Sequence, residues 1–151
     1  MVITLYTEEI MSDLRGISHH EVAEIPDVEA RYRAEAGTEK QHLIYKCVSE
    51  GVTRLARRCV RFLKGDYKTE ADNAGDIPKS YSLEFAFSER RALNKADALA
   101  ETMHFFVLHY ALSDFYSDVS QGELSNKHSL MAVEAGNGLD ALLYHKQPPV
   151  L

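Results

Sequence analysis

The segment from Met103 to Ser113 contains no Asp, Glu, Lys or Arg, and it lies within a longer helical pattern at residues 94–119. A helix in a small soluble domain usually keeps one polar face, so a helix that is apolar all round must be buried all round. A chain of 151 residues has few elements that could cover both faces. The segment is therefore either a central core helix or a helix whose second face is covered by another copy of the protein.

The helical repeat divides the apolar side chains of this pattern between two faces. One face carries Leu99, Met103, Phe106, Val107 and Tyr110. The opposite face carries Phe105, Leu108, Leu112 and Phe115. We predict these last four residues as oligomer-interface candidates, and enclosure of the segment by the other helices of the chain is the competing interpretation.

The rest of the sequence predicts a mainly α-helical chain. Further helical patterns span about residues 7–25, 38–64 and 125–144. Thr38 and Gln41 are spaced as a capping box, in which each side chain reaches the backbone N–H of the other residue. We therefore expect a helical bundle of about four helices with a small β element.

The β element is predicted from an alternating pattern. Residues 81–87 place apolar and polar side chains in turn, which is the period of a strand. The predicted strand, near residues 80–88, cannot satisfy its own backbone hydrogen bonds. Its partner is expected among residues 2–6, part of the loop at 66–79, or a strand of a neighbouring subunit.

Length and composition predict a single domain over residues 1–151, with a flexible loop at about 66–79 and an extended tail at 146–151. Cys47 and Cys59 lie on one predicted helix, about 18 Å apart, which is too far for a disulfide. We expect both to be buried thiols in a reducing compartment. No apolar run approaches the roughly 20 residues of a membrane span, so the expected location is the cytoplasm or a particle assembled there.

Charge is segregated along the chain. Residues 1–39 hold nine acidic and three basic residues, a net charge of −6, whereas residues 40–65 hold seven basic residues and one acidic residue, a net charge of +6. The basic face of the second helix is expected to remain solvated or to dock the acidic region of its own or a neighbouring subunit. The electrostatic docking candidates are Arg54, Arg57, Arg58 and Arg61.

The overall charge of −6 argues against nucleic acid as a partner. A DNA-binding regulatory module is therefore only the second alternative function.

Two Glu-x-x-His pairs support the first alternative, a ferritin-like metal-binding helical protein. Glu39 with His42 and Glu101 with His104 fit the pattern that di-iron carboxylate bundles use on two helices. The first pair lies in a first helical turn, where the helix dipole favours Glu in any case, so we expect surface or interface histidines and no cofactor. The motifs of hydrolases, zinc proteases and nucleotide-binding proteins are missing from the sequence. We therefore expect neither an enzyme nor a small-molecule substrate.

The last part of the chain carries an ordered series of capping and packing motifs. These are Ser88 to Lys95, His104, Val107, Ala111, Asp114-Phe115-Tyr116 and Lys146-Gln147-Pro148-Pro149. From Tyr81 to Pro149 the chain resembles a group of small proteins encoded among the morphogenesis genes of prophage-like elements in Bacteroidetes. The order of elements also resembles phage head–tail connector and tail-completion proteins, which form rings of small helical subunits.

This resemblance implies a structural role in a virion or tail, and it transfers no functional residue. Together with the apolar segment, it predicts a phage-derived structural protein that acts by self-association in a ring or other oligomer. The expected partners are further copies of the chain and other phage structural proteins.

Overall fold

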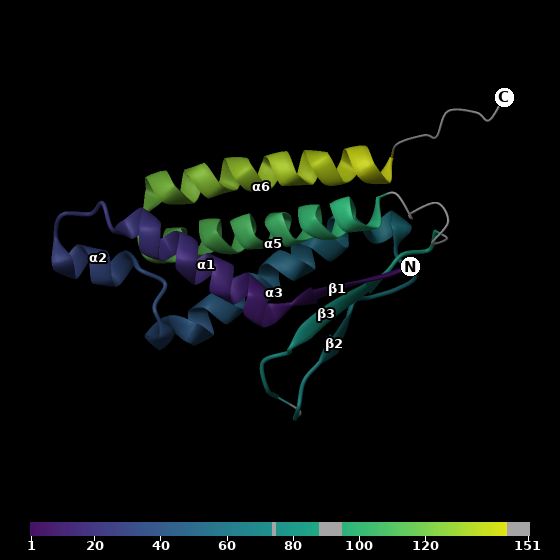
Figure 1. Cartoon of the computed structure of the whole chain (residues 1–151), viewed down its shortest axis with the longest axis horizontal. Helices are drawn as coiled ribbons and strands as arrows, with labels where there is room; N and C mark the ends of the chain where they lie inside the picture. Colours follow the sequence, from purple (N-terminus) through teal and green to yellow (C-terminus); the bar gives the residue numbers. More distant parts are fainter. Residues whose placement is uncertain (74, 88–94, 145–151) are drawn as a thin grey trace.

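A computed structural model describes residues 1–73, 75–87 and 95–144. In chain order its elements are β1 (Val2–Tyr6), α1 (Thr7–Val22), α2 (Val28–Ala34), the 3-10 turn η1 (Thr38–Lys40), α3 (Gln41–Arg58), the 3-10 turn η2 (Val60–Phe62), β2 (Lys68–Glu70), β3 (Ser80–Glu84), α5 (Ala96–Asp118) and α6 (Gly122–Leu143). Figure 1 shows the long helices packed along one another with the small sheet beside one end of them. The predicted fold class, a mainly α-helical bundle with a small β element, is confirmed.

The apolar helix α5 is the centre of the bundle, and it contacts α1, α3, α6 and β1. Leu108, Leu112 and Phe115 are at most 2% exposed. The prediction that these three residues contact another subunit is wrong, because the other elements of the same chain enclose α5. Phe105, the fourth candidate, is 44% exposed. The absence of a polar face on this helix is therefore explained by burial within one chain.

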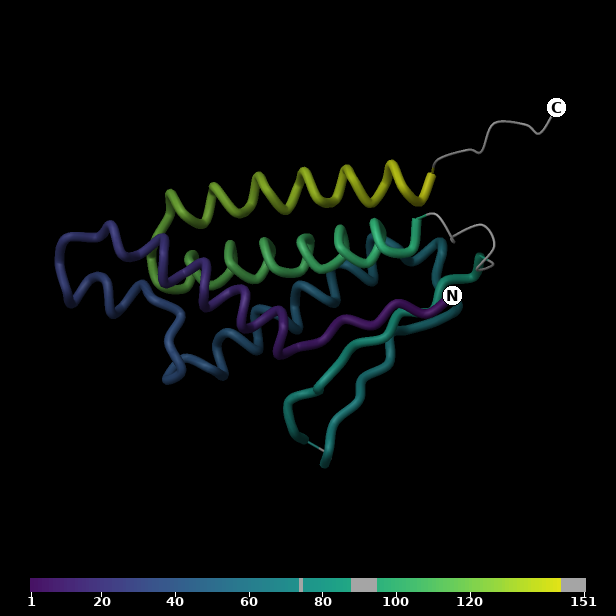
Figure 2. The backbone as a smooth tube through the Cα atoms, viewed as in Figure 1, coloured from purple at the N-terminus to yellow at the C-terminus, as the bar shows by residue number. Residues whose placement is uncertain are grey.

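The sheet has β3 in the middle, with β1 on one side and β2 on the other, and both pairings are antiparallel. Figure 2 traces β1 and β3 side by side, although 78 residues separate the paired Thr4 and Ser82. Both partners that were predicted from within the chain, residues 2–6 and the loop at 66–79, thus pair with the alternating strand. The inward-facing side chains Ile3, Leu5, Tyr81 and Leu83 are buried in the core.

The structure corrects the predicted ends of the second helix. Thr38–Lys40 form a 3-10 turn, and no side-chain hydrogen bond caps either this turn or α3, so the predicted capping box with Gln41 is wrong. The helix ends at Arg58, because the chain then tightens into η2 and turns towards the sheet. Residue 94, where the helical pattern around the apolar segment begins, and the predicted tail at 146–151 lie outside the described residues.

Candidate functional site

Five polar side chains meet where α1, α5 and α6 come together, and we call them the glutamate–histidine cluster. Oε1 of Glu21 lies 2.7 Å from Nε2 of His128 and accepts a hydrogen bond from the Tyr116 hydroxyl at 3.0 Å. Its Oε2 accepts a hydrogen bond from Nζ of Lys127 at 2.7 Å. His128 in turn contacts His109. Tyr116, His128 and His109 are 0%, 1% and 6% exposed, so these three residues lie inside the bundle. The Lys127 side chain is 56% exposed and closes the cluster at the surface.

The two histidines of the cluster face each other through the same type of ring nitrogen. Nδ1 of His109 lies 3.0 Å from Nδ1 of His128, and the two rings are stacked with an interplanar angle of 12°. One of these nitrogens must donate and the other must accept, so a single proton lies between them. The hydrogen bond therefore requires that the two rings do not both carry a proton at Nδ1.

The charges in the cluster depend on burial and on these hydrogen bonds. Burial by itself would raise the pKa of Glu21, but the hydrogen bonds from Lys127 and His128 outweigh it, and the pKa is lowered. Burial lowers the pKa of His109 to about 4, and the nearby His128 contributes in the same direction. Near neutral pH, Glu21 is thus a carboxylate and His109 is neutral. The cluster joins three helices through charge-assisted hydrogen bonds, which are stronger than hydrogen bonds between neutral groups.

A second polar contact joins α6 to α3. Arg58 donates from Nε to Oδ1 of Asp140 at 3.1 Å and from Nη2 to Oδ2 at 2.8 Å. This bidentate hydrogen bonding raises the pKa of Arg58 above its ordinary value. The guanidinium lies against Gly136, where a Cβ atom would approach it to 2.7 Å. Arg58, predicted as a docking residue for an acidic partner, is therefore engaged within its own chain.

Replacing Arg58 with Ala is expected to lower the free energy of unfolding by about 1 kcal/mol. The loss is modest because the Asp140 side chain is 42% exposed and water can solvate it once the arginine is gone. Urea denaturation followed by circular dichroism measures the change. Arg57→Ala is the matched control, since Arg57 is exposed on the same helix, and an equal loss in both variants would contradict a specific role for the Arg58–Asp140 pair.

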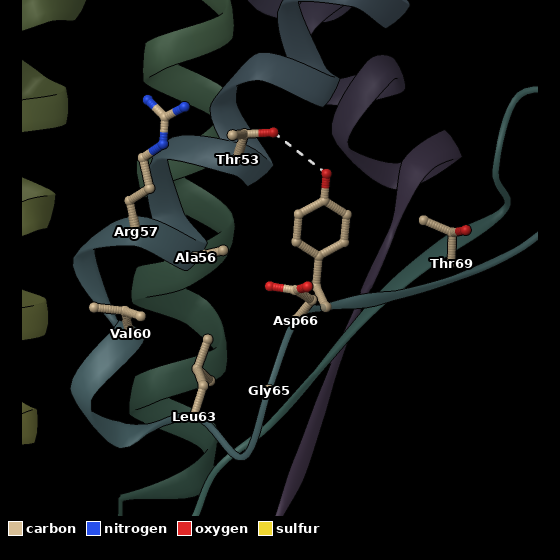
Figure 3. A pocket seen from close by; sticks show the side chains of 9 residues that line it. Thr53, Ala56, Arg57, Val60, Leu63, Gly65, Asp66 and Thr69 are labelled. Atoms are coloured by element: carbon tan, nitrogen blue, oxygen red, sulfur yellow. Dashed lines mark hydrogen bonds between the residues drawn. The ribbon is translucent and has the colours of Figure 1, made fainter.

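The other predicted docking residues lie along the outer face of α3 and η2. The Arg54 guanidinium lies 5.0 Å from the centre of the Tyr110 ring, and Arg57 and Arg61 are exposed. A hollow of about 540 Å³ lies between α3, η2 and residues 63–69, and the hydroxyls of Thr53 and Tyr67 are 3.3 Å apart at its edge. Figure 3 shows Arg57 among the side chains that line it. Within the described ranges, no ion pair joins these arginines to an acidic residue of the N-terminal region. Docking on their own subunit is thus not observed, and docking on a neighbouring subunit stays a prediction.

The outward face of α6 exposes apolar side chains. Figure 1 shows α6 as an outer helix, and it packs mainly on α5. Leu130 is 69% exposed and Val133 is 48% exposed, and their spacing of three residues places them on one side of the helix. Met131, on the adjoining flank, is 38% exposed. Neither Leu130 nor Val133 was among the interface candidates predicted from the sequence.

The two Glu-x-x-His pairs, which would supply the ligands in the metal-binding alternative, do not form such a site in the described residues. Among the described residues, no group of three or more His, Cys, Asp or Glu side chains is placed to hold a metal ion. Glu39 and His42 are exposed at η1 and the start of α3, and Glu101 is exposed on α5. Nε2 of His104 instead lies 2.7 Å from Oδ2 of Asp13.

Cys47 and Cys59 are buried and unpaired, as predicted from their spacing. Burial raises the pKa of Cys47 to about 12 and that of Cys59 to about 11, so both remain thiols at neutral pH. The thiolate is the nucleophilic form of cysteine, and these two residues therefore serve as packing groups.

No helix in the described part of the chain combines the length and the apolar character needed to cross a membrane. Comparison of the chain with protein-family models, with curated proteins and with solved structures found no match.

Proposed function

We propose that this chain is a structural subunit that works by self-association through the outward face of α6. The observation that carries the proposal is the exposure of Leu130 and Val133 side by side on an outer helix. Exposed apolar side chains that adjoin one another favour a protein contact, because the contact removes them from water. A phage-derived virion or tail, with other structural proteins of that particle as partners, is the proposed setting. It is supported by the resemblance of residues 81–149.

A second copy of α6 is the partner that fits this face best. Exposed residues follow the same side of the helix at intervals of three or four: Asn126, Leu130, Val133, Asn137 and Ala141. Amides lie before and after the apolar pair along the helix, and the exposed Lys127 and Glu134 lie three residues before and four residues after Leu130 on the same side. If two copies of this face pack antiparallel about a two-fold axis near Val133, each Leu130 lies opposite an Asn137, and the contact is self-complementary. The 22 residues of α6 give a contact up to about 33 Å long.

Replacing Leu130 with Lys tests this contact. The lysine charge would have to be buried within the interface, opposite the uncharged Asn137, so the dissociation constant of the oligomer is expected to rise about 100-fold. Light scattering at about 10 µM protein, well above the dissociation constant of a stable oligomer, should then show a fall towards the mass of a single chain, 17.0 kDa. Circular dichroism checks that the variant is folded, and Val133→Glu provides an independent second test.

The matched control is Val28→Lys, which places the same charge at a 72% exposed apolar residue on α2. This variant should keep the mass of the unmodified protein. If Leu130→Lys and Val28→Lys have the same mass as the unmodified chain, α6 is not the contact and the proposal fails.

A further inference from the structure

The helix that carries the proposed assembly face packs on α5, to which Ser125 is hydrogen-bonded through Ser113, and two charged contacts also attach it to the bundle. Near its C-terminal end, Asp140 is held by Arg58, and near its N-terminal end, Lys127 and His128 are held by Glu21. We infer that the glutamate–histidine cluster is a proton-sensitive latch that holds the N-terminal half of α6 on α1 and α5, and that acid releases it. The latch itself follows from the geometry of one chain. Its consequence for assembly rests on the proposed function.

The contact between the two histidines can tolerate one added proton but not two. If His128 carries its proton on Nε2, next to Glu21, its Nδ1 accepts a hydrogen bond from Nδ1 of His109. A proton added to the pair can be accommodated, because one of the two facing nitrogens still accepts. When both rings are imidazolium ions, two N–H groups and two positive charges face each other across 3.0 Å. The bond is then lost and replaced by repulsion at a buried site.

The groups around the histidine pair do not compensate a second positive charge. From α1, Glu21 faces the pair, but its carboxylate already accepts from Lys127, which is itself positive. From α5, Tyr116 and His104 are neighbours, and His104 is paired with Asp13 of α1. Within the described ranges, Glu21 is therefore the one carboxylate hydrogen-bonded to the cluster. Neutral His109 is the form that fits the closed bundle.

The direction of the pH effect on the latch follows from the pKa of His109. Its pKa is about 4 in the closed bundle, against an ordinary value of 6.5 when the ring is in water. The closed state is fully favoured above pH 6.5 and loses stability as the pH falls from 6.5 towards 4, because the released ring binds a proton more readily. Between about pH 7.5 and about pH 5, this difference raises the equilibrium constant for release about 30-fold.

Release of this part of α6 would also disturb the assembly face. Leu130 lies two residues beyond His128 on the same helix, so it moves with the latch. Acid is therefore expected to weaken self-association at a pH where the rest of the bundle remains folded. The effect on assembly would fail if the α6 contact failed, whereas the latch would remain measurable in a single chain.

Hydrogen exchange in the Leu130→Lys variant tests the latch separately from the assembly contact, because that chain is expected to be monomeric. After correction for the chemical exchange rate, amides of residues 124–132 should lose about 30-fold in protection between about pH 7.5 and about pH 5. Amides in the middle of α3 should change far less. Equal losses in α6 and α3 would mean that acid unfolds the whole bundle and would overturn the latch.

The variant His109→Gln tests whether His109 is the residue that makes the latch sensitive to pH. Its amide can still hydrogen-bond to His128 but does not titrate, so the pH dependence of exchange in α6 should disappear. The control is His42→Gln, which removes an exposed histidine from α3 and should keep the 30-fold effect. If His109→Gln retains the full pH dependence, the inference is wrong. Circular dichroism establishes that the variants are folded, and His109→Asn replaces His109→Gln if that chain is not.

Discussion

Replacing Glu21 with Ala is expected to lower the free energy of unfolding by about 3 kcal/mol. The carboxylate accepts hydrogen bonds from Tyr116 and Lys127 and pairs with His128, and its side chain is only 11% exposed. Without it, the hydroxyl of Tyr116 and Nε2 of His128 remain buried with no acceptor, and each such group costs about 1–3 kcal/mol. Urea denaturation at neutral pH measures the loss as a shift of the midpoint at constant slope.

Glu8→Ala is the control for this substitution. Glu8 also has a cationic partner, Arg15, at 2.8 Å, but its side chain is 79% exposed. An exposed pair of this kind contributes little, so its removal should change the stability by no more than about 0.5 kcal/mol. Similar losses for Glu8→Ala and Glu21→Ala would mean that the glutamate–histidine cluster does not hold α1, α5 and α6 together.

Replacing Gly51 with Leu is expected to cost about 3 kcal/mol or more of stability. A Cβ atom at this residue would lie 3.1 Å from the backbone oxygen of Val107 and 3.2 Å from its Cγ1, so α3 approaches α5 where only glycine fits without a shift. The remaining atoms of a leucine side chain have no space between the helices. Thermal and urea denaturation, followed by circular dichroism, give the change.

The same substitution at Gly16 is the matched control, because no atom lies within 4 Å of a Cβ atom at that residue of α1. Glycine is a poor helix former, so Gly16→Leu should leave the stability unchanged or raise it by up to about 1 kcal/mol. If the two variants lose stability equally, the close approach of α3 and α5 does not determine the effect at Gly51.

The apolar segment of α5 shows which features of the fold could be predicted from the sequence and which could not. Its lack of charge predicted burial on all sides, and the side chains of Leu112 and Phe115 are fully buried, whereas that of Phe105 is 44% exposed. The pattern could not decide which elements cover the helix, because periodicity reports a buried face and not its partner. The sequence left two covers possible for the second face, another subunit or the other helices of the chain, and the structure shows that other elements of the same chain supply the cover.

The glutamate–histidine cluster was missed because its members are distant in the sequence. Glu21 and His128 are 107 residues apart, and no short motif connects them. A signal was nevertheless present, since His109 lies inside a charge-free helix and a buried polar side chain requires a partner. The partners of the α3 arginines also could not be predicted from the sequence. Composition predicted a basic face, but the packing of α6 determines that Arg58 binds Asp140 while Arg57 remains exposed.

The mass of the unmodified chain in solution tests self-association most directly. Light scattering over a range of concentrations up to about 100 µM covers dissociation constants typical of specific contacts. A mass at or above twice the 17.0 kDa of one chain, falling on dilution or with Leu130→Lys, is the expected result. A constant mass of 17.0 kDa at every concentration would contradict the account.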